Sequence, residues 1–367
     1  MALKVGIVGL TNTGKTTIFN CFSNTKAQTS EYSFSTNKSN FGMAYVPDER
    51  LLKLTELVPT RKITYTTMEF VDIPGLTKGA SEGQGIGNSF LGDIRNVDAI
   101  VHVVRCFDNP NLPHVEGSID PVRDIEILDF ELQIKDLESI EKRIQKVEKK
   151  AKSGDKESKL EYDALVNVRQ ELQNFKNVRH IDIKPEDKKF VNDLFLLTDI
   201  PVMYVCNVDD KSAIEGNKHS KAVEQHIAKV EPNAKVITIA ARMEADIAEL
   251  EDEQERKVFL EDAGLSEPGI NKVIRTAYDL LDLRTFFTVG EEENRAWTIK
   301  KGWTAPEAAG VIHSDLKRGF IRAEVIAYED FIKYGSEHKC KEHGKLRLEG
   351  KEYIVQEGDI MHIRFNV

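Results

Sequence analysis

Cysteine is scarce in this sequence and long apolar runs are absent, and both absences exclude classes of protein. The four cysteines, Cys21, Cys106, Cys206 and Cys340, lie far apart and form no CxxC pair. This spacing argues against a disulfide framework or a zinc site and favours reduced thiols in or near buried elements. No apolar run approaches the span of a bilayer, and the N-terminus enters a strand without the parts of a signal peptide. The sequence therefore predicts a cytoplasmic protein with no membrane partner.

The chain also lacks an excess of positive charge. Its 61 acidic residues outnumber its 51 basic residues, and the formal net charge is −10. Such a surface does not as a whole attract nucleic acid or anionic lipid, so either partner must be met by a local patch. At 367 residues the chain is long enough for two or three domains, each with its own core.

Short apolar segments dominate the first part of the chain and predict buried parallel strands. Several are near-continuous runs of Val and Ile, which is typical of strands covered by helices on both faces. Amphipathic stretches lie between many of them, so an α/β doubly wound domain is expected over residues 1–280. The five segments are residues 3–10, 67–75, 99–107, 200–208 and 234–241.

The gap between the third and fourth segments is too long for an ordinary crossover. Residues 127–176 carry two helical patterns separated by the breaker "SGD" at 153–155, which predicts a coiled-coil helical hairpin inserted at 127–180. The first arm ends in "KRIQKVEKKAK" (142–152), with six basic residues and one acidic residue. Two explanations of this basic run remain open: a solvated helix face, or a contact with a phosphate backbone.

The pattern changes after the helix predicted near residues 268–283. Short strands with turn signals and one helix follow, which predicts a separate β-rich domain over residues 281–367. Acidic and basic residues nearly cancel there, so composition alone does not indicate a nucleic-acid binder.

A phosphate-binding motif lies at the start of the chain. "GLTNTGKTT" (9–17) matches G-x-x-x-x-G-K-[ST], and it follows an apolar strand and precedes the amphipathic "TTIFNCF". Glycines let successive backbone N–H groups point at phosphate. Lys15 brings positive charge to the β- and γ-phosphates, and Thr16 supplies a magnesium ligand. The predicted nucleotide contacts are Asn12, Thr13, Gly14, Lys15, Thr16 and Thr17.

A second motif favours a nucleotide hydrolase over a simple binder. "FVDIPG" (70–75) places Asp72 at the end of a strand, where it reaches Mg²⁺, and the Gly75 amide where it reaches the γ-phosphate. In the polar stretch 31–40, Thr36 either closes on the metal when a γ-phosphate is present or is a plain surface threonine. The glycines of residues 75–87 allow the large backbone changes of a nucleotide switch.

The segment that should read the base lacks one residue of the guanine motif. "VCNVDDKS" (205–212) keeps Asn207 and Asp210, but Val208 replaces the lysine that packs along the nucleotide. A buried Asp210 aimed at the base favours GTP strongly, because adenine has no N2 amine to pair with it. An Asp210 in solvent has no such effect. Asn207, Val208 and Asp210 are the predicted contacts on this side.

Together with "TTMEFVDIPGLTKGASEGQGIGNSFL" and "AWTIKKGWTAPEAAGVIHSDLKRGFIRAEVIAYEDF", these motifs resemble the YchF/Obg-like ATPase family over essentially the whole chain. The resemblance implies a C-terminal TGS-like domain, which is a ubiquitin-like β-grasp. It also implies a Mg²⁺-dependent ATPase, often described as GTP-dependent, that acts in translation and stress. The implied partners are the ribosome, as the large subunit or a 70S-type particle, and RNA; we expect a monomer.

The resemblance also concerns the attacking water. In the family a hydrophobic residue replaces the glutamine that follows DxxG, and here Leu76 stands there. Leucine cannot orient water by hydrogen bonding, so another group does so or turnover waits for a partner. His114 matches a histidine of the family and joins Lys15 and Gly75 as a candidate catalytic residue. The plainer alternative is a solvent-exposed loop histidine.

One feature of the base segment departs from the family. The family commonly has glutamate at the last position of the base motif, where this chain has Asp210, so ATP is the expected substrate with GTP kept open.

Two other functions remain open. The first is an RNA- or ribosome-binding adaptor whose nucleotide site is mainly structural. The second, a metabolic kinase, is weaker because no second substrate-binding constellation accompanies the P-loop.

Overall fold

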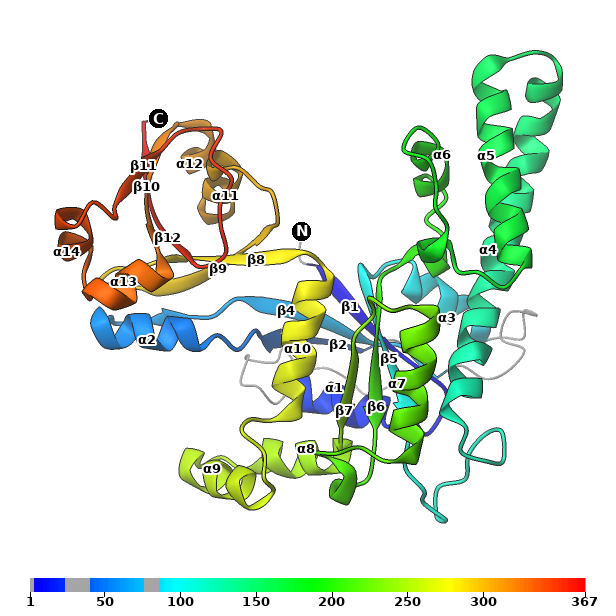
Figure 1. The fold of residues 1–367 in the computed structure, drawn as a ribbon, viewed down its shortest axis with the longest axis horizontal. Helices are drawn as coiled ribbons and strands as arrows, with labels where there is room; N and C mark the ends of the chain where they lie inside the picture. Colours follow the sequence, from blue (N-terminus) through cyan, green and yellow to red (C-terminus); the bar gives the residue numbers. More distant parts are fainter. Residues whose placement is uncertain (1–2, 24–39, 76–85, 367) are drawn as a thin grey trace. The chain divides into compact units, whose positions relative to one another are not determined.

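The computed structural model describes residues 3–23, 40–75 and 86–366, which fall into two compact units (Figure 1). Unit 1 comprises residues 1–44 and 69–277, and unit 2 comprises residues 45–68 and 278–367. This division differs from the expected one, 1–280 and 281–367, mainly because residues 45–68 group with the C-terminal part of the chain.

Unit 1 is built on a six-stranded sheet with the strand order β2-β4-β1-β5-β6-β7. The pairs from β4 through β7 are all parallel. All five predicted strands are present. The sequence missed β2, an edge strand in which buried positions alternate with partly buried or exposed ones, so it lacks the continuous apolar run of the central strands. The strands are β1 (Lys4–Val8), β2 (Asn40–Tyr45), β4 (Thr67–Asp72), β5 (Ala99–Arg105), β6 (Val202–Asn207) and β7 (Val236–Ile239).

Helices cover both faces of this sheet, as predicted. Phe70 and Val71 are neighbours on β4 and therefore point to opposite faces. Val71 packs into a core under α3, α4 and α7, whereas Phe70 stacks on Phe22 of α1 with ring centroids 3.9 Å apart. The helices of unit 1 outside the hairpin are α1 (Lys15–Ser23), α3 (Ile86–Ile94), η2 (Val178–His180), α6 (Lys188–Asn192), η3 (Leu197–Asp199), η4 (Asp210–Ser212), α7 (Lys218–Val230), α8 (Ala241–Glu249), α9 (Glu253–Asp262) and α10 (Gly269–Leu280).

The predicted helical hairpin is confirmed. It consists of α4 (Pro121–Lys152) and α5 (Lys156–Gln173), which are separated at residues 153–155. The first arm begins six residues before the expected start at 127, because the Asp120 carboxylate caps the helix by accepting from Arg123 N at 3.2 Å. The buried Asp136 of α4 accepts hydrogen bonds from the backbone of Leu197 and Thr198 at 2.7 and 2.8 Å. These bonds fix the base of the hairpin to η3, just before β6.

Unit 2 is a mixed sheet with the order β11-β10-β12-β8-β9-β3. Strand β8 is antiparallel to β9 and parallel to β12, and α11 packs on the resulting sheet. This is the β-grasp arrangement predicted for the C-terminal domain. Its elements are α2 (Glu49–Leu57), β3 (Ile63–Thr64), β8 (Leu283–Thr288), β9 (Asn294–Lys300), α11 (Ala305–Ile312), α12 (Ser314–Arg318), β10 (Phe320–Ala327), α13 (Tyr328–Tyr334), α14 (Glu337–Glu342), β11 (Arg347–Glu349) and β12 (Asp359–Phe365).

Residues 45–68 join unit 2 through both apolar and polar contacts. Leu51 and Leu54 of α2 are fully buried in a core with Phe287 and Ile360. Strand β3 pairs in parallel with β9, and Arg50 forms an ion pair with Glu357 at 2.6 Å. No local pattern in the sequence indicates these partners, because they lie more than two hundred residues away.

Candidate nucleotide-binding site

The P-loop connects β1 to α1 and has the backbone that its motif requires. Gly14 has a φ of +94°, and a side chain there would collide with the Asn207 amide. Gly9 has a φ of +153° and lies against the backbone of Val103. Both positions therefore need glycine. Asn12 is also left-handed, at +62°, which asparagine tolerates better than most residues.

Lys15 lies buried beneath the loop. Its Nζ donates to Leu10 O at 2.6 Å, and a methyl group at Gly75 would lie 3.0 Å from Nζ. The structure thus brings Gly75 of the DxxG motif against the P-loop lysine. Burial lowers the pKa of Lys15 to about 8, although the nearby Asp72 carboxylate acts in the opposite direction.

Thr16 and Asp72 form the pair expected to hold a metal. The Thr16 hydroxyl donates to Asp72 Oδ2 at 2.9 Å. Burial raises the pKa of Asp72, and the Thr16 hydrogen bond and the Lys15 charge oppose that shift. One hydroxyl and one carboxylate oxygen fit Mg²⁺, which takes few protein ligands and completes its shell with phosphate and water. Thr36, the third predicted metal ligand, lies outside the described residues, and so does Leu76.

A cavity of about 640 Å³ collects the predicted nucleotide contacts. It brings the P-loop together with the base segment, although neither Gly75 nor His114 lines it. The lining comprises Asn12, Thr13, Gly14, Lys15, Thr16, Thr17, Phe107, Asp108, Asn109, Leu112, Asn207, Val208, Asp209, Asp210, Ala241, Arg242, Ala245 and Asp246.

Asn207 joins the two halves of this cavity. Its Nδ2 donates to Thr13 O at 2.9 Å, and its Oδ1 accepts from Ala241 N at 2.9 Å. The side chain is buried, so it braces the P-loop against the start of α8. By contrast, Asp210 lies at the exposed start of η4. The carboxylate that would read guanine thus lines the cavity from its open side.

His114 is buried, not solvent-exposed. Its Nδ1 accepts from Glu116 N at 3.0 Å, so Nε2 carries the proton and donates to Asp124 Oδ2 at 2.8 Å. Asp124 is also buried and pairs with Arg123 at 3.0 Å. With both ring nitrogens occupied, His114 has no free lone pair for a water molecule in this conformation.

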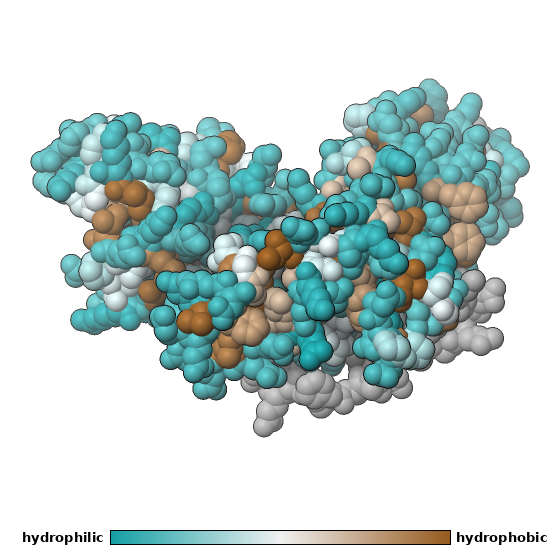
Figure 2. Space-filling model, turned by 60° about the horizontal axis from the view of Figure 1, so that its bottom comes forward, coloured by the Kyte–Doolittle hydropathy of each residue, from teal (hydrophilic) through white to brown (hydrophobic). Residues whose placement is uncertain are grey.

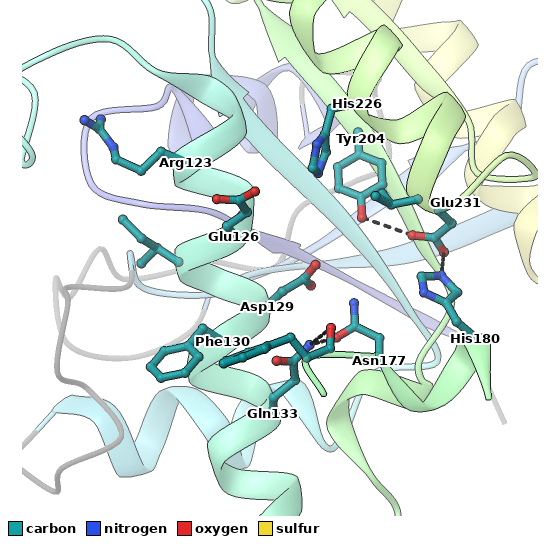
Figure 3. Close-up of a pocket in the computed structure, with 13 residues that line it drawn as sticks. Arg123, Glu126, Asp129, Phe130, Gln133, Asn177, His180, Tyr204, His226 and Glu231 are labelled. Atoms are coloured by element: carbon teal, nitrogen blue, oxygen red, sulfur yellow. Dashed lines mark hydrogen bonds and ion pairs between the residues drawn. The ribbon is translucent and has the colours of Figure 1, made fainter. Parts of the chain in front are cut away.

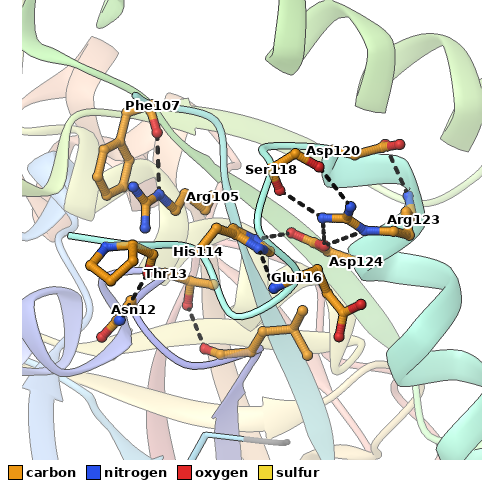
Figure 4. A network of polar contacts seen from close by, with 12 residues as sticks. Asn12, Thr13, Arg105, Phe107, His114, Glu116, Ser118, Asp120, Arg123 and Asp124 are labelled. Carbon is orange, nitrogen blue, oxygen red and sulfur yellow. Dashed lines mark hydrogen bonds and ion pairs between the residues drawn. The ribbon is translucent and has the colours of Figure 1, made fainter. Parts of the chain in front are cut away.

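Arg105, at the end of β5, is a residue of this region that sequence reasoning missed. It is only 1% exposed, and its Nε and Nη2 donate to Phe107 O and Leu112 O at 3.2 and 2.7 Å. The loop it holds ends next to Pro113, whose carbonyl accepts from Asn12 Nδ2 at 3.3 Å (Figure 4). Arg105 therefore shapes the segment that carries His114 to the P-loop. A charged residue closing the fully buried strand "AIVHVVR" was the available signal.

Within the described ranges, no helix combines the length and apolar character needed to cross a bilayer. On the face shown in Figure 2 hydrophilic residues predominate, with hydrophobic residues scattered between them.

Comparison with known proteins shows to which family a chain with this arrangement belongs. A family model described as "50S ribosome-binding GTPase" matches residues 4–207, and the YchF-GTPase_C model, described as a protein of unknown function, matches residues 283–366. The chain is 48% identical to the "Ribosome-binding ATPase YchF" of Bacillus subtilis and 50% identical to that of Haemophilus ducreyi, with 100% of each chain covered. The chain belongs to the YchF family.

A solved YchF structure agrees with this membership over nearly the whole chain. The "Schizosaccharomyces pombe YchF GTPase" superposes with a TM-score of 0.88 at 35% identity, covering 99% of this chain and 97% of that one. The family resemblance and the fold class inferred from the motifs are therefore confirmed. The bacterial YchF proteins are named ATPases and the S. pombe protein a GTPase, a difference that concerns the base end of the cavity.

Proposed function

We propose that this chain is a Mg²⁺-dependent nucleoside triphosphatase that hydrolyses ATP, with GTP kept as a second candidate substrate, and that acts as a nucleotide switch on the ribosome. The hydrolase part of this proposal rests on one observation: the P-loop, Asp72 and Gly75 lie together around Lys15. The names of its YchF relatives support the substrate and the partner.

The phosphate end supplies charge and orientation. Lys15 exchanges its bond to Leu10 O for phosphate oxygens, and the P-loop amides surround the phosphate chain. Thr16 and Asp72 would hold Mg²⁺, which neutralises charge on the transferring phosphoryl group. The Gly75 amide would donate a hydrogen bond to the γ-phosphate.

His114 is the proposed group that orients the attacking water. This role requires Nδ1 to give up the backbone amide of Glu116, which frees a lone pair for water. Asp124 already accepts a hydrogen bond from Nε2–H and would stabilise the imidazolium that forms when Nδ1 takes a proton. Replacing His114 with alanine should lower kcat at least tenfold and leave KM for ATP within about threefold. Equal losses in affinity and kcat would assign His114 a structural role instead.

The exposed position of Asp210 is compatible with ATP as the main substrate, for which the names of the YchF relatives are the support. A carboxylate in solvent is not left unpaired by adenine, so it imposes no penalty on ATP. Phosphate release from ATP and GTP, measured with the purified chain in Mg²⁺, tests this. If neither nucleotide is hydrolysed, with or without ribosomal particles, the hydrolase function is rejected and the adaptor function remains.

The end of the first hairpin arm is the proposed contact with ribosomal RNA. Lys146, Lys149 and Lys150 are exposed there, within the basic run 142–152. Reversing these three charges to glutamate should weaken co-sedimentation with 70S-type particles about tenfold or more, because each lost phosphate contact lowers affinity.

Lys221, Lys229 and Lys257 are exposed in the same unit and provide a matched charge reversal outside the hairpin. Equal loss in both triple variants would show a general charge effect and remove the hairpin from the proposal. Binding that persists unchanged in Lys15→Ala, at every nucleotide state, would argue against a switch.

A further inference from the structure

A second pocket in unit 1 has no part in the proposed hydrolysis. It has a volume of about 530 Å³, lies between α4, the segment around η2, β6 and α7, and shares no lining residue with the nucleotide cavity (Figure 3). Pockets of this size suit a small ligand or a single nucleotide.

The floor of this pocket is a polar network centred on Glu231. Glu231 accepts from Arg179 Nε at 2.9 Å and from Tyr204 OH at 3.1 Å, and its Oε1 lies 3.2 Å from His180 Nε2. These contacts occupy both carboxylate oxygens. Glu231 therefore shapes the floor and leaves recognition to other residues.

Asn177 aims a free hydrogen-bond donor into the pocket. Phe175 O can only accept, so the Gln133 group that faces it at 3.2 Å must be its NH₂. That NH₂ also donates at 2.6 Å to Asn177, which fixes Oδ1 of Asn177 on the Gln133 side. The Nδ2 of Asn177 is then directed into the pocket (Figure 3) and has no hydrogen-bond partner among the described residues, although the side chain is 5% exposed.

An acceptor and two aromatic rings accompany this donor. Asp129 contacts Arg179 through Oδ1 at 3.5 Å, which leaves Oδ2 for a ligand. Phe130 and Phe175 line the same pocket with ring centroids 6.1 Å apart and are 47% and 71% exposed. Phe175 holds its position with a φ of +60°, which is uncommon outside glycine.

We propose that this pocket binds a nucleobase, stacked on Phe130 and Phe175. Every base has a π-face and an edge with a hydrogen-bond acceptor beside a donor, which match Asn177 Nδ2 and Asp129 Oδ2. An arginine side chain would satisfy the rings and the carboxylate, but it has no acceptor for the Asn177 amide.

Ligand-detected NMR and calorimetry on the full chain, with the P-loop site saturated by Mg²⁺–ADP, test this proposal. Guanosine, the other three nucleosides and a single-stranded RNA pentamer are the probes, and N-acetyl-arginine amide is the comparator. Phe175→Ala should weaken nucleoside binding at least about tenfold, because base stacking contributes that much. Asn177→Asp, which keeps the bond to Gln133 and removes the donor, should weaken it similarly.

Phe195→Ala is the matched control. Phe195 is likewise an exposed phenylalanine with positive φ, 74% exposed and at +49°, and it does not line the pocket. Binding within about twofold of the unmodified chain is expected for it. Equal nucleoside binding in Phe175→Ala and the unmodified chain would overturn the proposal, as would tighter Phe175-dependent binding of N-acetyl-arginine amide. If the pentamer binds more tightly than the nucleosides and this binding depends on Phe175, the natural ligand is a base of RNA. If the pentamer and the nucleosides bind with equal affinity, the natural ligand is a free nucleoside or nucleotide.

Discussion

The two ends of the nucleotide cavity differ in how firmly the folded chain holds them. At the phosphate end, Lys15 and Thr16 are already fixed by hydrogen bonds to Leu10 O and Asp72. At the base end, Asp209 and Asp210 are exposed, and only Asn207 is anchored on both sides. Preorganised groups favour a reaction because no further ordering is needed, whereas exposed groups discriminate weakly. We therefore expect the chain to specify the triphosphate more strictly than the base.

The strongest test of this contrast is Lys15→Ala. We expect at least a hundredfold loss of phosphate release, the scale seen when one charge-stabilising group is removed. The free energy of unfolding should not fall, because the substitution removes a charge whose burial is costly. Thermal unfolding therefore separates lost chemistry from lost structure. Turnover within tenfold of the unmodified chain would contradict a catalytic phosphate end, and Lys221→Ala serves as the exposed control.

Asn207→Ala tests the element that the two ends share. Both of its hydrogen bonds are buried, so we expect a loss of about 1–3 kcal/mol in the free energy of unfolding. Affinity for ATP and GTP should fall together, by about tenfold, because the P-loop loses its brace. Denaturant unfolding and nucleotide titration measure both. A loss confined to GTP would show that Asn207 reads the base rather than supporting the loop.

The pH dependence of nucleotide binding tests the charge of Lys15 at the phosphate end. With a pKa of about 8 in the free protein, Lys15 is charged below that pH and increasingly neutral above it. Phosphate favours the charged form, so binding above pH 8 must take up a proton, and affinity should fall by up to about tenfold per pH unit between about pH 8 and 10. Calorimetry of ADP binding in buffers of different ionisation enthalpy at pH 8.5 measures the proton. No uptake at pH 8.5 would show that Lys15 stays charged in the free protein.

Asp210→Ala should have the smallest effect. Because the carboxylate is exposed, its removal should change the ratio of ATP to GTP affinity by less than about threefold. Competition titrations with both nucleotides measure the ratio. A tenfold or larger shift toward ATP would mean that Asp210 closes on the base when nucleotide binds, and the base end would then be as selective as the phosphate end.

The parts that the sequence predicted depend on local patterns. Apolar runs located the central strands, "SGD" located the break between the hairpin arms, and the P-loop spacing located Lys15 and Thr16. The sequence did not predict the edge strand β2, in which buried positions alternate with partly buried or exposed ones, or the pairing of β3 with β9. The burial of His114 and the role of Arg105 were also missed, because both depend on carbonyls and carboxylates that the folded chain brings together.

The sharing of unit 2 between two distant segments has a consequence for the synthesis of the protein. Leu51 and Leu54 leave the ribosome long before Phe287 and Ile360, against which they pack. At about 5–20 residues per second, the segment 45–68 waits roughly 10–45 seconds for strands β8 and β9 to be made. During that interval its apolar residues lack the native partners that the C-terminal strands supply, and they are open to chaperones and to misfolding. A fragment that starts at residue 278 would expose the complementary face of its core and the free edge of β9.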